Sequence, residues 1–267
     1  MAAEKAAVIG HPVAHSRSPA MHTAAYRALG LDWEYTAVDV APGGLRAFVA
    51  GLDAAGYAGV NVTIPHKQAV LDLCGELSDE ARRAGSVNTV LVRDGGLRGE
   101  TTDGAGLLWA LGPLEPADAL VVGAGGAARA VVAALVAAGW KVAVSARRPV
   151  AAAELGAGVA PWPPARAAAL VVNTTPIGQH EYPVPGTQYS FPPELIEPGM
   201  IVVDLAYRGD GSPTPLIAAA GERGARAVDG LEVLVGQGIY AFELLTGVPA
   251  PVDVMRAAAR AQTPPDR

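Results

Sequence analysis

The sequence predicts an α/β protein with two domains, each built around a mostly parallel sheet, and two observations carry this prediction. Short apolar runs alternate with helix-like stretches along most of the 267 residues, a rhythm typical of a sheet covered by helices on both faces. The proline-rich link GPLEPAD, residues 112–118, interrupts this alternation, and a second strand–helix series follows it. Two such series in a chain of this length indicate two domains.

The first series is expected to contain four strands and the helices between them. The strands are expected at residues 6–10, 33–40, 58–64 and 87–92, and the helices at residues 19–29, 43–54 and after Pro65. Ser18 followed by Pro19 predicts a helix start, with the serine as N-cap and the proline at the first helical position.

The second series is expected to form a separate sheet. Its strands are expected at residues 119–122, 142–145, 169–173, 201–205 and 225–228, with a helix after Gly126. Helices at 230–246 and 252–261 need not belong to this sheet, and the loop 176–193 is long enough to be a mobile flap. We therefore predict a first domain of residues 1–103 completed by 236–267, and a second of residues 104–235.

The amino-acid composition limits which binding partners and which cellular compartment the protein can have. The formal net charge of −6 and the isoelectric point near 5.4 argue against a chain that envelops nucleic acid or an anionic membrane. The most apolar stretch, residues 130–140, is too short to span a bilayer, and MAAEKAAVIGHP lacks the layout of a signal peptide. The single cysteine, Cys74, excludes an internal disulfide. We expect a cytoplasmic protein with a small-molecule partner, present as a monomer or homodimer.

Lysine and asparagine are scarce in this chain, and the positions they occupy indicate a functional site. Three lysines stand against seventeen arginines, so Lys67, after the strand-like run GVNVTIP, suggests a role that an always-charged arginine cannot fill. The three asparagines, Asn61, Asn88 and Asn173, stand at ends of strand-like runs. Ligands of parallel α/β sheets bind outside the carboxyl ends of the strands, so these positions indicate ligand contact. A surface lysine and three turn-forming asparagines are the alternative.

A glycine-rich motif between a strand and a helix predicts dinucleotide binding. LVVGAGGAARAVVAAL, from Leu120, places Gly123, Gly125 and Ala128 in the order G-x-G-x-x-A. The first glycine permits a tight turn, the second lets the backbone approach a pyrophosphate, and the small third residue lets the helix pack against the strand. Backbone N–H groups at the helix start then hold the phosphates. The second domain is therefore expected to be a Rossmann dinucleotide-binding domain.

The end of the next strand favours NADP over NAD. An NAD site places an acidic side chain about 20 residues after the glycines, where it binds the ribose 2′-hydroxyl. This chain has Ser145, Ala146, Arg147 and Arg148 there. Two guanidinium groups suit a 2′-phosphate, and no carboxylate is present to repel it. A solvated basic turn is the alternative.

Five polar motifs then need one explanation: HSRSP at residues 15–19, NVTIPHK at 61–67, SVNT at 86–89, TTDG at 101–104 and LVGQG at 234–238. In order and spacing they resemble the shikimate dehydrogenase family, which shows H-S-x-S-P, N-V-T-x-P-x-K, V-N-T, N-T-D-G, G-A-G-G-A and a late glutamine. The resemblance covers about residues 9–247. It implies an N-terminal substrate domain and the reversible, NADPH-dependent reduction of 3-dehydroshikimate to shikimate in the chorismate and aromatic amino-acid pathway.

The resemblance also implies roles for individual residues. Lys67 and Asp103 match the catalytic pair, and Ser16 and Ser18 match the donors to the substrate carboxylate. The other predicted substrate-binding residues are Asn61, Thr63, Asn88, Asp103, Tyr207 and Gln237. The predicted cofactor-binding residues are Gly123, Ala124, Gly125, Gly126, Ala127, Ala146, Arg147, Arg148, Thr174, Leu205 and Gly230.

Lys67 and Asp103 also suit ketone reduction on physical grounds. A hydride delivered to a ketone leaves an alkoxide that must be protonated as it forms, so a donor must lie beside the carbonyl oxygen. Lys67 is expected in the first turn of a helix, whose positive end disfavours the ammonium, whereas the Asp103 carboxylate favours it. These effects oppose each other, so proton donor and electrostatic anchor both stay open for Lys67; we prefer the donor.

The chain departs from the family pattern at two places. Ala146, Arg147 and Arg148 replace the family's Asn-Arg-Thr, which adds charge for the phosphate but alters the adenine-side contacts. Thr101 replaces the usual asparagine before Thr-Asp-Gly, where we expect little effect. Four histidines lack metal-ligand spacing with carboxylates or cysteines, so no metal is predicted; they are His11, His15, His22 and His66.

Other functions are open on the same scaffold. A quinate/shikimate dehydrogenase paralogue using NAD is the nearest one. A non-catalytic NADP(H)-binding sensor would be free to lose Lys67 and Asp103, yet both are present. A folate-type dehydrogenase lacks support from HSRSP, whose paired hydroxyls suit a small carboxylate.

Overall fold

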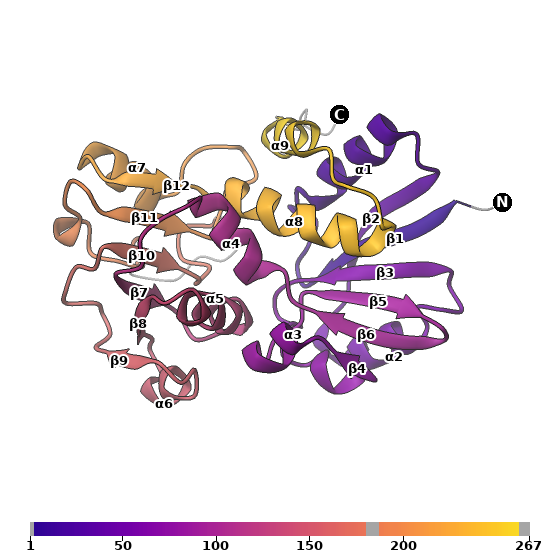
Figure 1. Ribbon diagram of the computed structural model, residues 1–267, viewed down its shortest axis with the longest axis horizontal. Helices are drawn as coiled ribbons and strands as arrows, with labels where there is room; N and C mark the ends of the chain where they lie inside the picture. The colour runs from indigo at the N-terminus through magenta and orange to yellow at the C-terminus, as the bar shows by residue number, and fades with distance from the viewer. Residues whose placement is uncertain (1–2, 180–186, 262–267) are drawn as a thin grey trace. The chain divides into compact units, whose positions relative to one another are not determined.

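The chain folds into two compact units in the computed structural model, which describes residues 3–179 and 187–261 (Figure 1). The first unit consists of the chain up to Gly106 together with Leu234–Ala261, and the second consists of Leu107–Val233. The chain passes between the units inside two helices, α4 (Asp103–Leu111) and α8 (Gly230–Thr246). The predicted α/β class is confirmed, since each unit contains its own sheet.

The sheet of the first unit is mixed. Its strands are β1 (Glu4–Gly10), β2 (Trp33–Asp39), β3 (Tyr57–Val62), β4 (Glu76–Leu77), β5 (Thr89–Arg93) and β6 (Gly96–Glu100). Their spatial order is β2-β1-β3-β5-β6-β4. β1 pairs in parallel with β2 and β3, and β4 with β6, whereas β5 runs antiparallel to both β3 and β6. The sequence did not reveal β4 or β6, because short strands carry little periodic signal.

The direction of β5 decides which loops meet at one edge of this sheet. Asn61, near the end of β3, pairs with Thr89 at the start of β5, and Thr89 pairs with Glu100 at the end of β6. Ile9, near the end of β1, pairs with Val62. The segments that follow β1, β3 and β6 and the segment that precedes β5 therefore emerge at the same edge.

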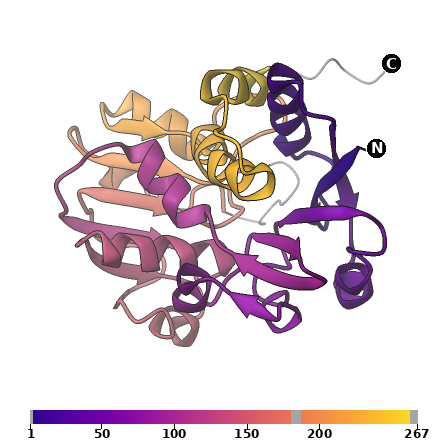
Figure 2. The same ribbon diagram turned by 45° about the vertical axis from the view of Figure 1, so that its right-hand side comes forward.

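The core of the first unit consists of apolar side chains between this sheet and its helices. Val60 and Val62 of β3 and Val90 of β5 pack with Leu45 and Val49 of α2 (Leu45–Ala50). Helix α2 is shorter than the expected helix at residues 43–54, because a 3₁₀ turn, η1 (Pro42–Gly44), precedes it. Helix α3 (Asp79–Ala84) lies after β4, and α9 (Val252–Arg260) packs against α1 (Ser18–Leu29), as Figures 1 and 2 show.

Helix α1 starts one residue earlier than predicted. Arg17 is its N-cap, Ser18 is its first helical residue, and no side chain caps it. The Ser18 N–H instead donates to the Ser16 hydroxyl at 3.3 Å. The helix ends at Leu29, and the next residue, Gly30, adopts a φ of 66° and caps the last turn through a bond from its N–H to the Arg27 carbonyl.

The helix expected after Pro65 does not form. Turns occupy this segment up to a short 3₁₀ helix, η2 (Leu71–Leu73). The Lys67 carbonyl accepts the Val87 N–H at 2.9 Å, and Leu71 N–H turns to the Gln68 carbonyl. In an α-helix the Lys67 carbonyl would accept the Leu71 N–H. Here it accepts the Val87 N–H instead and so holds the segment before β5. Lys67 consequently does not lie at the positive end of a helix, and that part of the electrostatic prediction is wrong.

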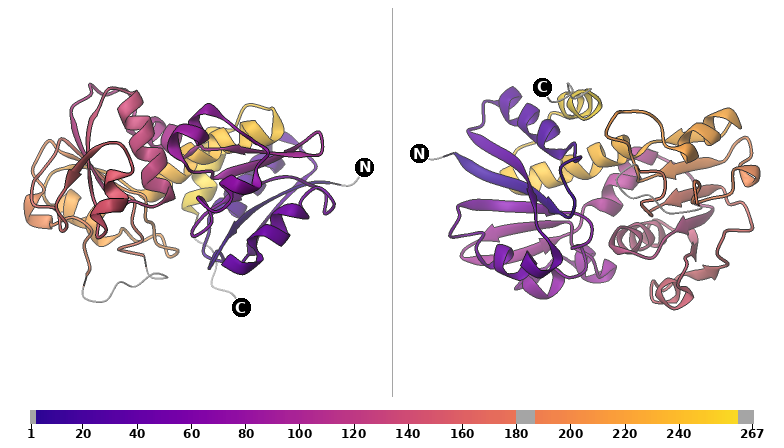
Figure 3. Two further views of the ribbon diagram at one scale, coloured as in Figure 1. Left: turned by 90° about the horizontal axis from the view of Figure 1, so that it is seen from below. Right: turned by 180° about the vertical axis from the view of Figure 1, so that it is seen from behind.

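The second unit is a Rossmann-type domain with a fully parallel sheet, seen from two further sides in Figure 3. Its strands are β7 (Asp118–Val122), β8 (Lys141–Ser145), β9 (Gly158–Ala160), β10 (Leu170–Asn173), β11 (Ile201–Asp204) and β12 (Arg226–Val228). The spatial order is β12-β11-β10-β7-β8-β9. The three strands that come first in the chain, β7 to β9, thus form one half of the sheet, and β10 to β12 form the other half. This is the 3-2-1-4-5-6 order of dinucleotide-binding domains, whose ligands bind where the order reverses, here between β7 and β10.

The central strands of the second unit are buried beneath the helices that pack on the sheet. Val121, Val144 and Val172 are fully buried in neighbouring strands, as expected for a parallel sheet covered on both faces. The helices are α5 (Gly126–Ala137), α6 (Pro149–Ala153) and α7 (Pro215–Glu222), with a short 3₁₀ helix, η3 (Pro193–Leu195). Residues 180–186 of the expected flap at 176–193 lie outside the described residues.

The bounds of the two C-terminal helices agree closely with those predicted from the sequence. Helix α8 spans the predicted residues, and α9 ends one residue before its predicted end. No helix in the described ranges is both long enough and apolar enough to cross a membrane.

Candidate active site

Lys67 and Asp103 form an ion pair at the sheet edge of the first unit. The Lys67 Nζ lies 2.5 Å from the Asp103 Oδ2, and the two side chains are only 14% and 9% exposed. Lys67 lies in the turn after β3, and Asp103 is the first residue of α4. Shielding from solvent strengthens the attraction, and it makes the loss of either partner costly. The structure thus brings together the two residues predicted as the catalytic pair.

Asn88 completes the surroundings of the Asp103 carboxylate. Its Nδ2 donates to Asp103 Oδ1 at 2.9 Å, while the Lys67 ammonium takes Oδ2. The same Nδ2 lies 2.9 Å from the Thr102 hydroxyl and 3.1 Å from Gln237 Oε1. The Asn88 Oδ1 accepts the Thr102 backbone N–H at 2.7 Å. Each oxygen of the carboxylate therefore faces its own donor, and its plane is held in one orientation.

Gln237 reaches this cluster because α8 lies close to the start of α4. A side chain at Gly106 would collide with the backbone of Gln237, with its Cβ only 2.7 Å from the Gln237 Cα. Glycine is therefore required where the two helices touch. Sequence reasoning did not single out Gly106, although the second glycine of TTDGAG was the available signal.

Ser16, Ser18 and Thr63 emerge at the same edge of the sheet. Ser16 is half-buried in the turn after β1, and Ser18 is buried at the start of α1. Thr63 directly follows β3, and its N–H donates to the Ile9 carbonyl of β1 at 2.9 Å. The strand pairing thus places these three hydroxyls at the edge that also carries Lys67 and Asp103.

Asn61 lies within a strand, whereas the other predicted substrate-binding residues of the first unit lie outside the strands. It lies inside β3 and is 5% exposed. Its Oδ1 accepts a hydrogen bond from the Tyr35 hydroxyl at 2.6 Å, and its Nδ2 donates to the Thr89 hydroxyl at 2.9 Å. Both ends of the amide are therefore bonded inside the protein. Sequence reasoning missed Tyr35, Thr89 and Thr102, because nothing local to them indicates which amide they would meet.

The glycine turn of the second unit has the geometry expected for phosphate binding. Gly123 adopts a φ of +117°, and a side chain there would collide with the Thr174 hydroxyl. Gly125 is the N-cap of α5, and a Cβ built on it would meet nothing within 4 Å. Ala128 is fully buried where α5 packs against the sheet. The turn and the uncapped helix start leave backbone N–H groups for a pyrophosphate.

The other predicted cofactor-binding residues lie at the carboxyl edge of the same sheet. Thr174 follows β10, and its hydroxyl donates to the Val122 carbonyl at the end of β7, 2.8 Å away. Leu205 follows β11, and a side chain at Gly230 would meet the Leu205 carbonyl at 2.7 Å, so these two backbones nearly touch. Arg147 and Arg148 follow β8 and are exposed, whereas the preceding Ala146 is buried. The chemistry of these residues, backbone N–H groups and two exposed arginines, fits an NADP molecule.

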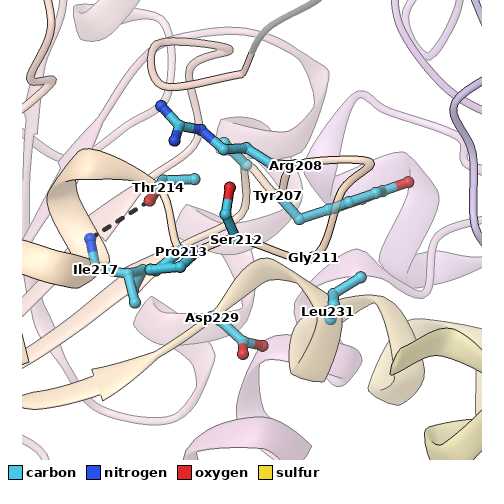
Figure 4. A pocket seen from close by; sticks show the side chains of 10 residues that line it. Tyr207, Arg208, Gly211, Ser212, Pro213, Thr214, Ile217, Asp229 and Leu231 are labelled. Carbon is cyan, nitrogen blue, oxygen red and sulfur yellow. Dashed lines mark hydrogen bonds between the residues drawn. The ribbon is translucent and has the colours of Figure 1, made fainter. Parts of the chain in front are cut away.

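Tyr207 lies on the loop after β11, beside a pocket of about 170 Å³ in the second unit (Figure 4). The pocket is lined by Ala206, Tyr207, Arg208, Gly211, Ser212, Pro213, Thr214, Ile217, Asp229 and Leu231. Figure 4 marks the bond from the Ile217 N–H to the Thr214 hydroxyl, which caps α7. Tyr207 thus belongs to a loop fixed at its far end by a helix cap.

Asp204, the last residue of β11, anchors both ends of this loop by hydrogen bonds to Ala206 and Thr214. The carboxyl is fully buried and accepts hydrogen bonds from Thr214 Oγ1 at 2.5 Å, Asn173 Nδ2 at 2.7 Å and the Ala206 N–H at 3.0 Å. Burial raises the pKa of Asp204 to about 7, against the opposite effect of these hydrogen bonds. Asn173 was interpreted as a ligand contact, but it is fully buried and also bonds Thr175.

Three of the histidines contact neighbouring residues of the first unit. His66 Nε2 lies 2.6 Å from the Val40 carbonyl, and His11 Nδ1 lies 2.6 Å from Asp39 Oδ1. His22 is stacked on Tyr35, and burial lowers the pKa of this imidazole to about 3. Within the described ranges, no group of three or more His, Cys, Asp or Glu side chains is arranged to hold a metal ion.

Comparison with known proteins identifies the family. Residues 8–90 match the model of the shikimate dehydrogenase substrate binding domain, and residues 230–260 match the model of the shikimate 5′-dehydrogenase C-terminal domain. The chain is 42% identical to the shikimate dehydrogenase (NADP(+)) of Moorella thermoacetica over 95% of its own length and 92% of the relative. It is 43% identical to that of Rubrobacter xylanophilus over 94% and 93%.

The chain belongs to the shikimate dehydrogenase family. Solved structures agree with this assignment. The shikimate 5-dehydrogenase of Thermus thermophilus, in complex with NADP(H) and shikimate, is 41% identical with a TM-score of 0.87, over 96% of this chain and 98% of that one. Quinate dehydrogenase from Corynebacterium glutamicum, in complex with NAD, is 30% identical with a TM-score of 0.81 over the same shares of the two chains.

Proposed function

We propose that this shikimate dehydrogenase reduces 3-dehydroshikimate to shikimate reversibly with NADPH, a step of the chorismate and aromatic amino-acid pathway. The observation that carries the proposal is the shielded Lys67–Asp103 pair, with Asn88 and Gln237 bonded around it. The likeness to NADP-dependent shikimate dehydrogenases along nearly the whole chain supports the substrate and the cofactor. A sensor without catalysis would not need to keep a charged pair away from solvent.

The residues of the first unit hold the substrate. Ser16 and Ser18 donate to its carboxylate, while Thr63, Asn88 and Gln237 bind ring hydroxyls. Their position at one sheet edge supports this assignment. Tyr207 of the second unit is a further substrate-binding residue. The predicted division into a substrate domain (residues 1–103 with 236–267) and an NADP domain (104–235) is part of this proposal.

Lys67 donates the proton to the carbonyl oxygen as it becomes an alkoxide. NADPH, when bound, supplies the hydride for this reduction. The ammonium next to the Asp103 carboxylate carries a proton to donate, and Lys67 itself lies in the turn after β3 rather than in the first turn of a helix. Asp103, held by Asn88 on its other oxygen, aligns the amine and orients a substrate hydroxyl. In the reverse direction Lys67 accepts the proton.

The second unit holds NADP. Gly123, Gly125 and the neighbouring Ala124, Gly126 and Ala127 form the phosphate turn. The 2′-phosphate is bound by Arg147 and Arg148, next to the buried Ala146. Thr174, Leu205 and Gly230 complete the site at the carboxyl edge, where the backbones of Leu205 and Gly230 nearly touch and the Thr174 hydroxyl bonds the end of β7.

A single assay tests the function. Purified protein is mixed with 3-dehydroshikimate and NADPH, and NADPH absorbance is followed in time; consumption is expected. Parallel reactions with shikimate or quinate and with NADP⁺ or NAD⁺ should give the highest kcat/KM for shikimate with NADP⁺. A preference for quinate and NAD⁺ would instead assign the chain to the quinate dehydrogenases, to which it also has a likeness.

We further propose that the enzyme works in the cytoplasm as a monomer or homodimer. The free thiol of Cys74, half-buried in the first unit, supports a reducing compartment. Light scattering of the purified protein measures the number of subunits.

A further inference from the structure

We propose that Tyr35, Asn61 and Thr89 are positioning residues that set the orientation of Asn88 and, through it, of the Asp103 carboxylate. The proposal rests on the proposed function. It gives Asn61 a different role from the substrate contact that the family resemblance implies.

The five residues form a continuous chain of hydrogen bonds across the sheet. The Tyr35 hydroxyl of β2 lies 2.6 Å from Asn61 Oδ1 on β3. Asn61 Nδ2 lies 2.9 Å from the Thr89 hydroxyl on β5. That hydroxyl lies 3.3 Å from Asn88 Oδ1, and Asn88 Nδ2 lies 2.9 Å from Asp103 Oδ1. We name this series the Tyr35–Asp103 relay.

Two backbone groups fix the direction of every bond in the relay. The Thr102 N–H must meet an oxygen, so Asn88 turns Oδ1 toward it and Nδ2 toward Asp103. The Asn88 carbonyl accepts only, so Asn61 turns Nδ2 toward it at 3.4 Å and Oδ1 toward Tyr35. The Thr89 hydroxyl then accepts from Asn61 and donates to Asn88 Oδ1.

All donors of the relay consequently point toward the carboxylate. Hydrogen bonds aligned in one direction polarise one another, so each strengthens the next. The end of the series is an Asn88 N–H aimed at Asp103 Oδ1, opposite the oxygen that meets Lys67. The relay thus holds the plane of the carboxylate and, with it, the direction of the Lys67 amine.

Burial makes the relay rigid. Tyr35, Asn61, Thr89 and Asn88 are all buried, and a buried amide left without a partner costs free energy. The Tyr35 ring is itself held by His22, which stacks on it with centroids 4.3 Å apart and an interplanar angle of 8°. No member can rotate without leaving a polar atom of its neighbour unpaired.

Helix α1 offers a matched control in Tyr26. Tyr26 is also buried and lies against His22, with ring centroids 6.1 Å apart. Its hydroxyl has no hydrogen-bond partner among the described residues. Tyr35→Phe and Tyr26→Phe remove the same atom from two buried rings, but only the first removes a bond of the relay.

Thr89 separates positioning from packing. Thr89→Val keeps the shape and removes the hydroxyl, whereas Thr89→Ser keeps the hydroxyl and removes a methyl group. If Thr89 acts through the relay, the serine variant keeps the activity of the unaltered enzyme and the valine variant loses it. If Thr89 only fills space, the valine variant keeps the activity and the serine variant loses it.

The experiment measures shikimate oxidation with NADP⁺, the dissociation constant of NADP⁺ and the thermal midpoint of the unaltered enzyme and the four variants. We expect Tyr35→Phe and Thr89→Val to lower kcat by about 5- to 10-fold, the effect of one lost hydrogen bond. Tyr26→Phe and Thr89→Ser should stay within about twofold. NADP⁺ binding should be unchanged in all, because the nucleotide site belongs to the second unit.

Two results would overturn the relay. Equal kcat values for Tyr35→Phe and Tyr26→Phe would show that the Tyr35 hydroxyl positions nothing, and a valine variant more active than the serine variant would reduce Thr89 to packing. Absence of shikimate oxidation by the unaltered enzyme is a different result, since it would remove the proposed function itself and the relay with it.

Discussion

At the scale of single residues, burial explains why Lys67 and Asp103 depend on each other. Each is largely shielded from water, and each would carry an uncompensated charge without the other. Asn88 adds a directed N–H to the carboxylate, so the position of the amine follows from three side chains that come from separate segments of the first unit.

Replacing Lys67 should separate catalysis from cofactor binding. Lys67→Ala is expected to lower kcat by at least ~10², because the alkoxide loses its proton donor, and to leave NADPH affinity nearly unchanged. Steady-state kinetics and a fluorescence titration with NADPH measure both. Lys141→Ala is the control, because this exposed lysine forms an ion pair with Asp118 on the neighbouring strand, at 3.5 Å, and belongs to no predicted site. Unchanged turnover in Lys67→Ala would remove Lys67 from the mechanism.

Arg147 and Arg148 should decide the choice of cofactor. Changing both to glutamine is expected to weaken NADPH binding by about 100-fold, because two charge-assisted hydrogen bonds to a phosphate are lost. The affinity for NADH should change little. The double change of Arg82 and Arg83 to glutamine removes equally exposed guanidinium groups from α3 and serves as control. An equal loss for both nucleotides would contradict the role of the arginines in binding the 2′-phosphate.

At the scale of elements, the site of the first unit depends on where strands and helices meet. β5 runs antiparallel to β3, which brings the start of one strand beside the end of the other and places Asn88 next to Thr102 and Asp103. Helix α8 contributes Gln237 because Gly106 lets it touch the start of α4.

A side chain at Gly106 should disturb this contact. Alanine is the better helix former, but in Gly106→Ala the new methyl group overlaps the Gln237 backbone. We expect a loss of about 1–3 kcal/mol of unfolding free energy, typical of overpacking, and a higher KM for shikimate as Gln237 moves. Urea unfolding and steady-state kinetics measure the two effects.

Gly221→Ala is the matched control for this prediction. Gly221 also lies in a helix, α7, and a Cβ on it would meet nothing within 4 Å. This variant should be as stable as the unaltered protein or more stable by up to ~1 kcal/mol. If Gly106→Ala behaved in the same way, close helix contact could not be the reason for that glycine.

At the scale of the whole molecule, stability depends on pH through a buried carboxyl outside the proposed catalytic pair. The pKa of Asp204 is raised to about 7 by burial, whereas an unfolded chain releases this proton near pH ~4. Between these values the folded protein keeps a proton that the unfolded chain has lost. The free energy of unfolding contributed by Asp204 therefore falls as pH rises from about 4 to about 7, and levels off above.

Asp204→Asn should remove this dependence, because the amide keeps the shape of the protonated carboxyl. Relative to the unaltered protein, the variant is expected to gain stability as pH rises from about 4 to about 7. Urea unfolding followed by tryptophan fluorescence measures it, since Trp140 and Trp162 lie in the same unit. A stability difference that stays constant with pH would show that Asp204 titrates alike in both states.

The sequence by itself determined the fold class, the strand–helix series and most elements to within a few residues. Periodicity, glycines and prolines act locally, so they are readable without knowing the neighbours. Lys67 was noticed from its place after a strand-like run and Asp103 from the resemblance to the family, and the structure pairs them. The glycine turn at Gly123 also followed from local signals.

Only the tertiary structure decided which polar groups meet. The helix expected after Pro65 is absent because the Lys67 carbonyl bonds Val87, a partner twenty residues away in the chain. Asn61 and Asn173 lie in buried hydrogen-bond networks that include residues of other strands, which no local pattern indicates. Hydrogen-bond partners brought together by strand pairing depend on the direction and register of the strands, and these are set by the packing of the whole sheet rather than by local sequence.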